Sequence, residues 1–254
     1  DPTAMRILDI IEDLGAEIIP IECDAEGPLP SSLARALQKN PTAFIYQPRT
    51  HAVTGRALSR ERMRELAVTL EASDCLIIED DGVGDVSPLP PISMGDRFPG
   101  RVVHILSFSK SLGPDLRLAV LSSSTSVAKQ IQSYRSFSSG WTSRLLQAAT
   151  AWLLRDPESM RMVAYARSVY AERRASLTSR LGERGIDVSP GDGLCIWIPV
   201  ESEQYALVTL AARGIAALPG AKCSVRAVNH IRIATGTLTD RYDLVADSIA
   251  LAAR

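Results

Sequence analysis

The sequence predicts an α/β fold: a mainly parallel sheet flanked by helices, followed by a smaller α+β C-terminal domain. Helical and strand patterns alternate along the chain, as expected for an α/β domain. Two continuous apolar runs, 75–78 and 102–106, are typical of parallel strands covered on both faces. After Gly185 short strands frame two helices, which indicates a second, smaller unit. With 254 residues, the chain is long enough for a sizeable core.

The first half of the chain begins with apolar residues at helical spacing, ended by Gly15. The β-rich segment that follows contains Pro20, which favours an edge strand. Ser59 is placed to cap a helix. The expected helices are 5–14, 29–39 and 60–71, and the expected strands are 17–22, 42–47, 75–78, 102–106 and 117–122.

In the second half, long helical patterns precede the small domain. The expected helices are 126–136, 142–155, 157–181, 204–213 and 240–253, and the expected strands are 194–199 and 231–234. We therefore expect residues 1–156 to belong to a large domain. Residues 157–254 would supply a connecting long helix and the small C-terminal domain.

Composition excludes several classes of protein. The formal net charge is −1 and the arginines are scattered, so direct DNA binding by this chain is not expected. No apolar run approaches a membrane span, and the first residues lack a signal-peptide pattern. Four cysteines far apart suggest reduced thiols in a cytoplasmic protein. Three dispersed histidines make a metal site unexpected.

Polar side chains follow the predicted strands where a ligand would bind in such a sheet. Asp80 follows one strand, Lys110 lies between Ser107 and Ser109 after the next, and Arg117 follows seven residues later. Taken singly, these are ordinary features: a loop acid, a surface lysine, a salt-bridge arginine. Together they match the needs of pyridoxal phosphate, namely an amine for its aldehyde, a carboxylate for its ring nitrogen, and hydroxyls and a guanidinium for its phosphate.

At this point the chain resembles the fold-type I, aspartate-aminotransferase-like pyridoxal-phosphate proteins. More narrowly, it resembles the aminotransferase-like domain of MocR-type regulators of the GntR superfamily. The stretch SFSKSLGPDLRLAVL (107–121) carries most of the resemblance. The other matching stretches are IIEDD (77–81), YQPRTHAVTG (46–55), GWTSRLLQ (140–147) and HIRIA (230–234). The match covers only about the later two-thirds of that domain, so the N-terminal part of the large domain and the DNA-binding domain are expected to be missing.

The resemblance implies a role for each matching residue. Lys110 would be the catalytic lysine that bonds the cofactor, and Asp80 would face its ring nitrogen. Ser107, Ser109 and Arg117 would bind its phosphate, and Arg232 would bind the carboxylate of an amino-acid ligand. A rim arginine on an edge strand is the plainer interpretation of Arg232.

The remaining residues of the matching stretches carry weaker expectations. Trp141 and Arg144 either lie near a subunit interface or, for Trp141, pack in the core. His51 and His104 are interpreted as structural histidines. A role at the cofactor stays open for His51, because it falls close to the cofactor loop. By resemblance, the protein is expected to form a homodimer.

Two positions depart from the family pattern. The loop that usually reads Asn-Pro-Thr-Gly is Ala52-Val53-Thr54-Gly55, and the tyrosine expected two residues after Asp80 is Gly82. Both lost donors would have contacted the phenolic oxygen of the cofactor. The leading interpretation is therefore an effector domain that senses pyridoxal phosphate, or an amino compound through it. A free-standing class I/II aminotransferase acting on a 2-oxo acid and a cofactor-free dimerisation scaffold remain open.

Overall fold

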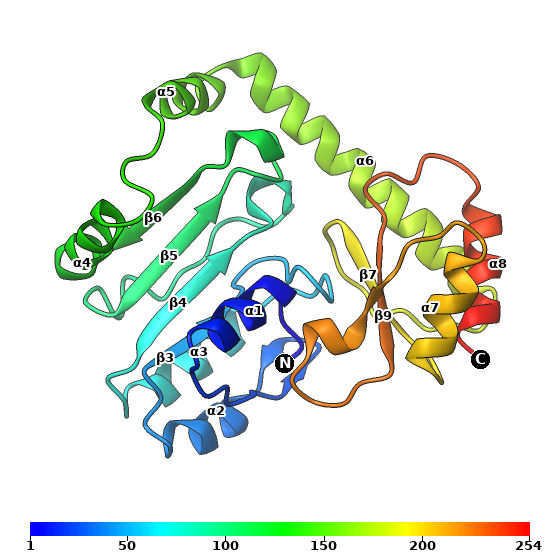
Figure 1. Cartoon of the computed structure of the whole chain (residues 1–254), viewed down its shortest axis with the longest axis horizontal. Coiled ribbons are helices and arrows are strands. Elements are labelled where there is room, and N and C mark those ends of the chain that lie inside the picture. The colour runs from blue at the N-terminus through cyan, green and yellow to red at the C-terminus, as the bar shows by residue number, and fades with distance from the viewer. The chain divides into compact units, whose positions relative to one another are not determined.

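The computed structural model describes all residues from Asp1 to Arg254, which group into two compact units (Figure 1). The first unit contains Asp1–Leu29, His51–Ala57 and Ser168–Arg254. The second contains Pro30–Thr50 and Leu58–Arg167. The linear sequence did not indicate that the first 29 residues and the segment 51–57 group with the C-terminal part.

A four-stranded sheet organises the second unit. Its strand order is β3-β4-β5-β6, with the first three strands parallel and β6 antiparallel to β5. Continuous apolar runs produce the parallel strands, as expected for strands covered on both faces. The strands are β3 (Ala43–Tyr46), β4 (Leu76–Asp81), β5 (Val102–Ser107) and β6 (Ala119–Ser123). The prediction of a mainly parallel sheet flanked by helices is confirmed.

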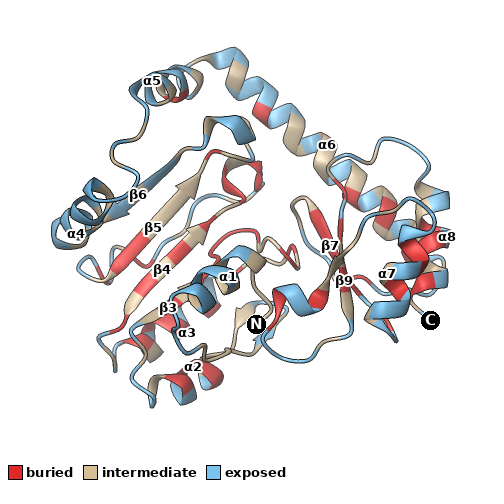
Figure 2. Ribbon diagram, in the orientation of Figure 1, coloured by how far each residue is buried: buried red, intermediate tan, exposed pale blue.

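Two helices of this unit pack against each other and contribute to its core. They are α2 (Pro30–Leu37) and α3 (Arg60–Leu70). The predicted cap of α3 is confirmed, because the hydroxyl of Ser59 accepts a hydrogen bond from the Arg62 amide at 3.0 Å. The fully buried side chains of this region are Leu33, Leu66, Leu70 and Ile77. Figure 2 shows buried positions on α2 and along β4. The unit also contains α4 (Thr125–Ser136), α5 (Arg144–Leu153) and the first part of α6 (Pro157–Gly182).

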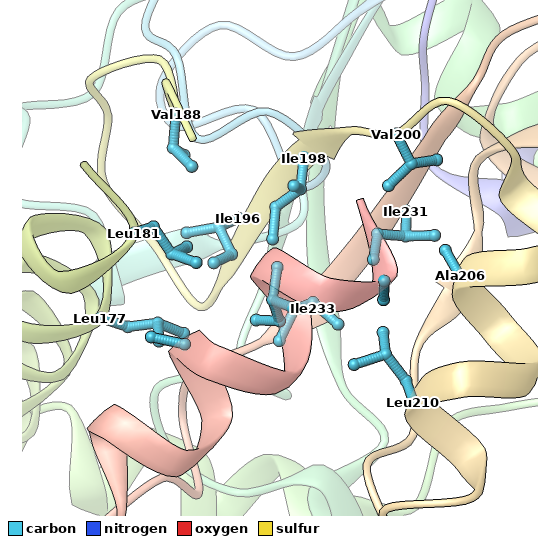
Figure 3. Close-up of a cluster of buried hydrophobic side chains, with 13 residues drawn as sticks. Leu177, Leu181, Val188, Ile196, Ile198, Val200, Ala206, Leu210, Ile231 and Ile233 are labelled. Atoms are coloured by element: carbon cyan, nitrogen blue, oxygen red, sulfur yellow. The ribbon is translucent and has the colours of Figure 1, made fainter. Parts of the chain in front are cut away.

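The first unit has a three-stranded antiparallel sheet of order β7-β9-β8. Its elements are β7 (Cys195–Pro199), α7 (Glu203–Ala211), β8 (Leu218–Pro219), β9 (His230–Ala234) and α8 (Tyr242–Ala252). One face of the sheet packs on α7, α8 and the end of α6 through a cluster of aliphatic side chains (Figure 3). Alternation along β9 aims Ile231 and Ile233 into this cluster and leaves Arg232 on the opposite face.

In the N-terminal segment the predicted helix forms, whereas the predicted strand does not. Helix α1 (Met5–Asp13) ends before Gly15, whose φ of 63° is the left-handed conformation that favours glycine. The predicted strand 17–22 is wrong: the strands of this region are β1 (Cys23–Asp24) and β2 (Gly27–Pro28), which pair with each other. A strand exists only through a hydrogen-bonded neighbour, and Pro20 removes one donor from this segment. The two-residue strand β8 was not predicted.

The state of the cysteines and the length and polarity of the helices can be compared with the expectations from composition. All four cysteines are free thiols, and Cys75, Cys195 and Cys223 are buried. The long helices, α6 included, are too polar or too short to cross a bilayer.

Candidate functional site

Five of the predicted site residues lie at one edge of the four-stranded sheet. Strands β4 and β5 are parallel, with Asp80 opposite Ile105, so Asp80 and Ser107 lie on the same face near the carboxyl ends of neighbouring strands. Strand β6 runs back from that edge, with Ala119 opposite Ser107. Arg117 therefore lies just before β6 at the same edge. The structure thus brings the acid, the serines, the lysine and the arginine to one edge of the sheet.

A tight turn after β5 presents Lys110. The amide of Leu112 donates to the carbonyl of Phe108 at 2.9 Å, and the Ser109 amide donates to the Ser107 hydroxyl at 3.3 Å. The buried ring of Phe108 anchors this turn, while Lys110 is exposed. The hydroxyl of Ser111, next to the lysine, is buried and has no hydrogen-bond partner.

Gly84 brings the loop after β4 against this turn. A Cβ at Gly84 would lie 2.5 Å from the Ser107 carbonyl oxygen, and its φ of 61° is unfavourable for other residues. Only glycine allows this approach. The loop after Asp80 and the end of β5 are thus packed backbone to backbone.

Arg117 has an unusual backbone. Its φ of 47° and ψ of 37° are left-handed, a conformation that residues other than glycine adopt rarely. The guanidinium is exposed and makes no hydrogen bond or ion pair within the chain. Strained backbone of this kind clusters at ligand sites, where the surrounding structure holds it in place. The sequence pattern gave no sign of this conformation.

The side chain of Asp80 is held by Gln47. The Gln47 amide nitrogen donates to Asp80 Oδ2 at 2.7 Å. Burial raises the pKa of Asp80, the hydrogen bond from Gln47 lowers it, and the nearby charge of Asp81 raises it further. The net direction is upward. Gln47 was not singled out from the sequence, although its position at the end of a predicted strand was a usable signal.

A buried polar network covers the opposite face of β4. Glu79 is fully buried and accepts hydrogen bonds from the Tyr46 hydroxyl at 2.7 Å and the Met94 amide at 2.7 Å. His104 lies 2.8 Å from its other carboxylate oxygen. Although burial raises the pKa of Glu79, these hydrogen bonds outweigh it, and the net direction is downward. The interpretation of His104 as a structural histidine agrees with this contact.

Asp81 belongs to the same buried face. Its carboxylate pairs with Arg49, with Nη2 at 2.6 Å and Nε donating at 2.7 Å, and both side chains are almost fully buried. Arg49 also donates to the Leu89 carbonyl at 3.3 Å, which ties the loop after β4 to the sheet. Of the two adjacent aspartates, Asp80 therefore faces the predicted site and Asp81 is structural.

Arg232 belongs to the first unit. It lies on the central strand β9, so the interpretation as an edge-strand arginine is wrong. Its Nε donates to the carbonyl of Ala52 at 3.3 Å, and its two terminal nitrogens make no hydrogen bond within the chain. The guanidinium therefore keeps donors for a planar acceptor such as a carboxylate.

The segment 51–57 is a compact loop closed on itself. His51 Nδ1 accepts from the Thr54 amide at 3.2 Å, and the His51 amide donates to the Arg56 carbonyl at 2.8 Å. Burial lowers the pKa of His51 to about 4. An acceptor role for Nδ1 requires the neutral ring, in agreement with the lowered pKa. These contacts agree with the interpretation of His51 as a structural histidine.

Trp141 does not pack in the core. Its side chain is 87% exposed, and with Ser143, Arg144 and Leu145 it lines a shallow surface hollow. Tyr134 and Phe137, at the end of α4, are exposed to a similar degree. The core-packing alternative for Trp141 is therefore wrong within this chain.

Comparison with known proteins identifies the family of the chain and the structures that share its fold. A family model described as "Aminotransferase class I and II" matches residues 2–249. The chain belongs to the class I and II aminotransferase family. Aspartate aminotransferase from Thermus thermophilus, solved with maleate, superposes on 99% of the chain with a TM-score of 0.90 at 20% identity, and the match covers 68% of that protein. LysN from the same species, an α-aminoadipate aminotransferase complexed with N-(5′-phosphopyridoxyl)-L-leucine, superposes on 99% of the chain with a TM-score of 0.89 at 20% identity, and the match covers 69% of that protein.

Two proteins similar in sequence to this chain are transcription regulators. The vitamin B6 salvage pathway transcriptional repressor PtsJ of Salmonella typhimurium is 33% identical over 94% of this chain. The regulator TauR of Rhodobacter capsulatus is 30% identical over 83% of the chain. The matches cover 56% of PtsJ and 45% of TauR, so this chain spans about half the length of each. The family and the fold-type I architecture expected from the sequence are thus confirmed.

Proposed function

We propose that this chain is the aminotransferase-like effector domain of a MocR-type transcription regulator. It would bind pyridoxal 5′-phosphate, the cofactor implied by its family, and sense either the cofactor or an amino compound through it. The observation that carries the proposal is the gathering of Asp80, Ser107, Lys110 and Arg117 at one sheet edge in a chain 33% identical to a vitamin B6 repressor.

The residues present fit pyridoxal phosphate. Lys110 supplies an exposed amine, Asp80 a carboxylate with one oxygen still free of hydrogen bonds, and Arg117 an unpaired guanidinium. The buried, unpartnered hydroxyl of Ser111 marks the same turn as one built around a further polar group. When bound, the cofactor supplies an aldehyde for the lysine and a ring that accepts electrons. Lys110 would hold it covalently, Asp80 would keep its ring nitrogen protonated, and Ser107, Ser109 and Arg117 would bind its phosphate.

The two substitutions in the family pattern favour sensing over turnover. Ala52 has no side-chain donor and Gly82 has no side chain, so neither adjusts the proton affinity of a bound cofactor. Loss of one donor at a charge-stabilising site typically lowers rates by roughly 10²–10³. Arg232 is proposed to bind the carboxylate of an amino compound.

Borohydride trapping tests the proposal. The protein is mixed with pyridoxal phosphate, reduced with borohydride, digested and analysed by mass spectrometry. We expect a single modified peptide, containing Lys110, and none in Lys110→Ala. Modification spread over several lysines, unchanged in Lys110→Ala, would contradict cofactor binding and favour the scaffold alternative.

An assay of amino-group transfer separates the sensor from an enzyme. Cofactor-loaded protein is mixed with a panel of amino acids and 2-oxo acids, and the cofactor spectrum is followed. We expect spectral evidence of amino-acid binding without turnover. Turnover within seconds would support the free-standing aminotransferase instead. For the chain itself, we also expect no salt-sensitive binding to a defined operator fragment, because its net charge is −1.

A further inference from the structure

Gln47 is placed to control the carboxylate of Asp80. It directly follows β3, and in the parallel register Tyr46 pairs with Glu79, so Gln47 stands beside Asp80 on the same face. Its side chain is buried, with 8% of the residue exposed. The amide nitrogen donates to Asp80 Oδ2 at 2.7 Å. A neutral amide donor orients a carboxylate without cancelling its charge.

The two oxygens of Asp80 have different surroundings. Oδ2 is engaged by Gln47, whereas Oδ1 accepts no hydrogen bond from the chain. Oδ1 instead lies beside Gly82, where an added Cβ would be 3.1 Å away. Such a contact is tight enough that any side chain at position 82 would push on the carboxylate. Gly82 thus leaves Oδ1 open.

We propose that Gln47 is a positioning residue that fixes the Asp80 carboxylate through this hydrogen bond and turns its free oxygen, Oδ1, toward the ring N–H of the bound cofactor. The inference rests on the proposed function for the identity of that cofactor. The interaction between Gln47 and Asp80 itself does not, since it exists without any ligand.

Two features of the surroundings of Asp80 act against its charged form. Burial and the neighbouring charge of Asp81 both favour the protonated, neutral form of Asp80. A protonated carboxyl would no longer stabilise a positive ring nitrogen. The Gln47 amide is the feature that opposes both effects, because a donor to a carboxylate favours its charged form.

The first experiment is a titration of the cofactor-free protein. Carboxyl-¹³C aspartate labelling with NMR follows Asp80, which is assigned from its loss in Asp80→Asn. Gln47→Met keeps the side-chain length and removes the donor. We expect the titration midpoint of Asp80 to rise in Gln47→Met and to stay unchanged in Gln132→Met, on the exposed side of α4. An unchanged midpoint in a folded Gln47→Met protein would overturn the proposal.

A second measurement uses the parent protein and needs no substitution at Gln47. In the parent protein, the side-chain amide protons of Gln47 should shift with the same midpoint as the Asp80 carboxyl. If they do not respond, the proposal is wrong even where Gln47→Met fails to fold.

The third measurement is affinity for pyridoxal phosphate, by fluorescence titration. We expect Gln47→Met to bind about tenfold more weakly than the parent, as expected when one hydrogen bond to a charged group is lost. Unchanged affinity despite a raised Asp80 midpoint would overturn the positioning role. If the parent itself does not bind the cofactor, the proposed function is wrong, and the titration still decides whether Gln47 controls Asp80.

Discussion

At the scale of single residues, neighbours in sequence have opposite roles because strand β4 alternates its faces. Asp80 lies on the face of the candidate site with Gln47, whereas Glu79 and Asp81 lie on the other face in buried contacts with Tyr46 and Arg49. Three consecutive acids therefore divide into one carboxylate at the candidate site and two in buried structural contacts. The same register places Ser107 on the face of Asp80.

This alternation predicts different consequences for the two aspartates. Asp80→Asn should weaken cofactor binding about tenfold, because the ring nitrogen loses its charged partner, with little change in thermal stability. Asp81→Asn should instead lower the free energy of unfolding by about 3 kcal/mol, because the buried Arg49 loses its short ion pair and keeps only the longer one to Asp85, at 3.5 Å. Fluorescence titration and urea unfolding measure the two effects. Equal losses of affinity in both variants would show that the assignment of Asp80, rather than Asp81, to the ring nitrogen is wrong.

His51 predicts a dependence of stability on pH. Its pKa is lowered to about 4 in the folded chain, against an ordinary value near 6.5. Between these pH values the unfolded state binds a proton that the folded state does not, so stability falls as the pH is lowered from 6.5 to 4. The contribution is about 1–3 kcal/mol. Urea unfolding across this range should show a smaller decrease for His51→Gln, and parallel curves for the two proteins would contradict the assignment.

At the scale of elements, the conformation of the loop 51–57 depends on Gly55. Gly55 has a φ of 73°, and a Cβ there would lie 2.5 Å from the Asp192 carbonyl oxygen. The backbone also pairs at this point, since the Asp192 amide donates to the Gly55 carbonyl at 2.8 Å. The loop that carries the altered family motif is thus fastened to the segment around Asp192, within the same unit.

Gly55→Ala should therefore destabilise the first unit. Strain and the clash with Asp192 together should lower the free energy of unfolding by about 1–3 kcal/mol. Gly15→Ala is the matched control, because Gly15 has a similar φ of 63° with nothing within 4 Å of an added Cβ. Its cost should be about 1 kcal/mol. If urea unfolding gives the same midpoint for both variants, the close approach to Asp192 contributes nothing.

At the scale of the whole molecule, the segment 134–145 leaves large apolar side chains in water. Tyr134, Phe137, Trp141 and Leu145 are each at least 76% exposed. Exposed apolar groups of this size usually mark a surface that another chain or segment covers. We propose that this segment takes part in the homodimer expected for the protein.

Sedimentation velocity tests that proposal. The parent chain should show concentration-dependent association, and the double variant Phe137→Ser/Trp141→Ser should shift it toward monomer. Leu244→Ser is the control, because Leu244 is an exposed apolar residue on α8. A monomeric parent chain, or equal association of parent and double variant, would remove the segment from the interface.

The sequence by itself determined the α/β class, most helices and strands, and the residues at the candidate site. These features depend on local patterns, namely apolar periodicity, the cap at Ser59 and the stretch around Lys110, which the chain carries without reference to distant residues.

Only the tertiary structure decided the features that depend on pairing. The segment 17–22 has a strand-like composition but takes no strand conformation, and the direction of β6 followed from its pairing with β5. The hydrogen bond from Gln47 to Asp80 and the burial of Asp81 with Arg49 join residues about 32 positions apart. The physical reason is that register and burial arise from contacts between distant segments, which local propensity does not encode.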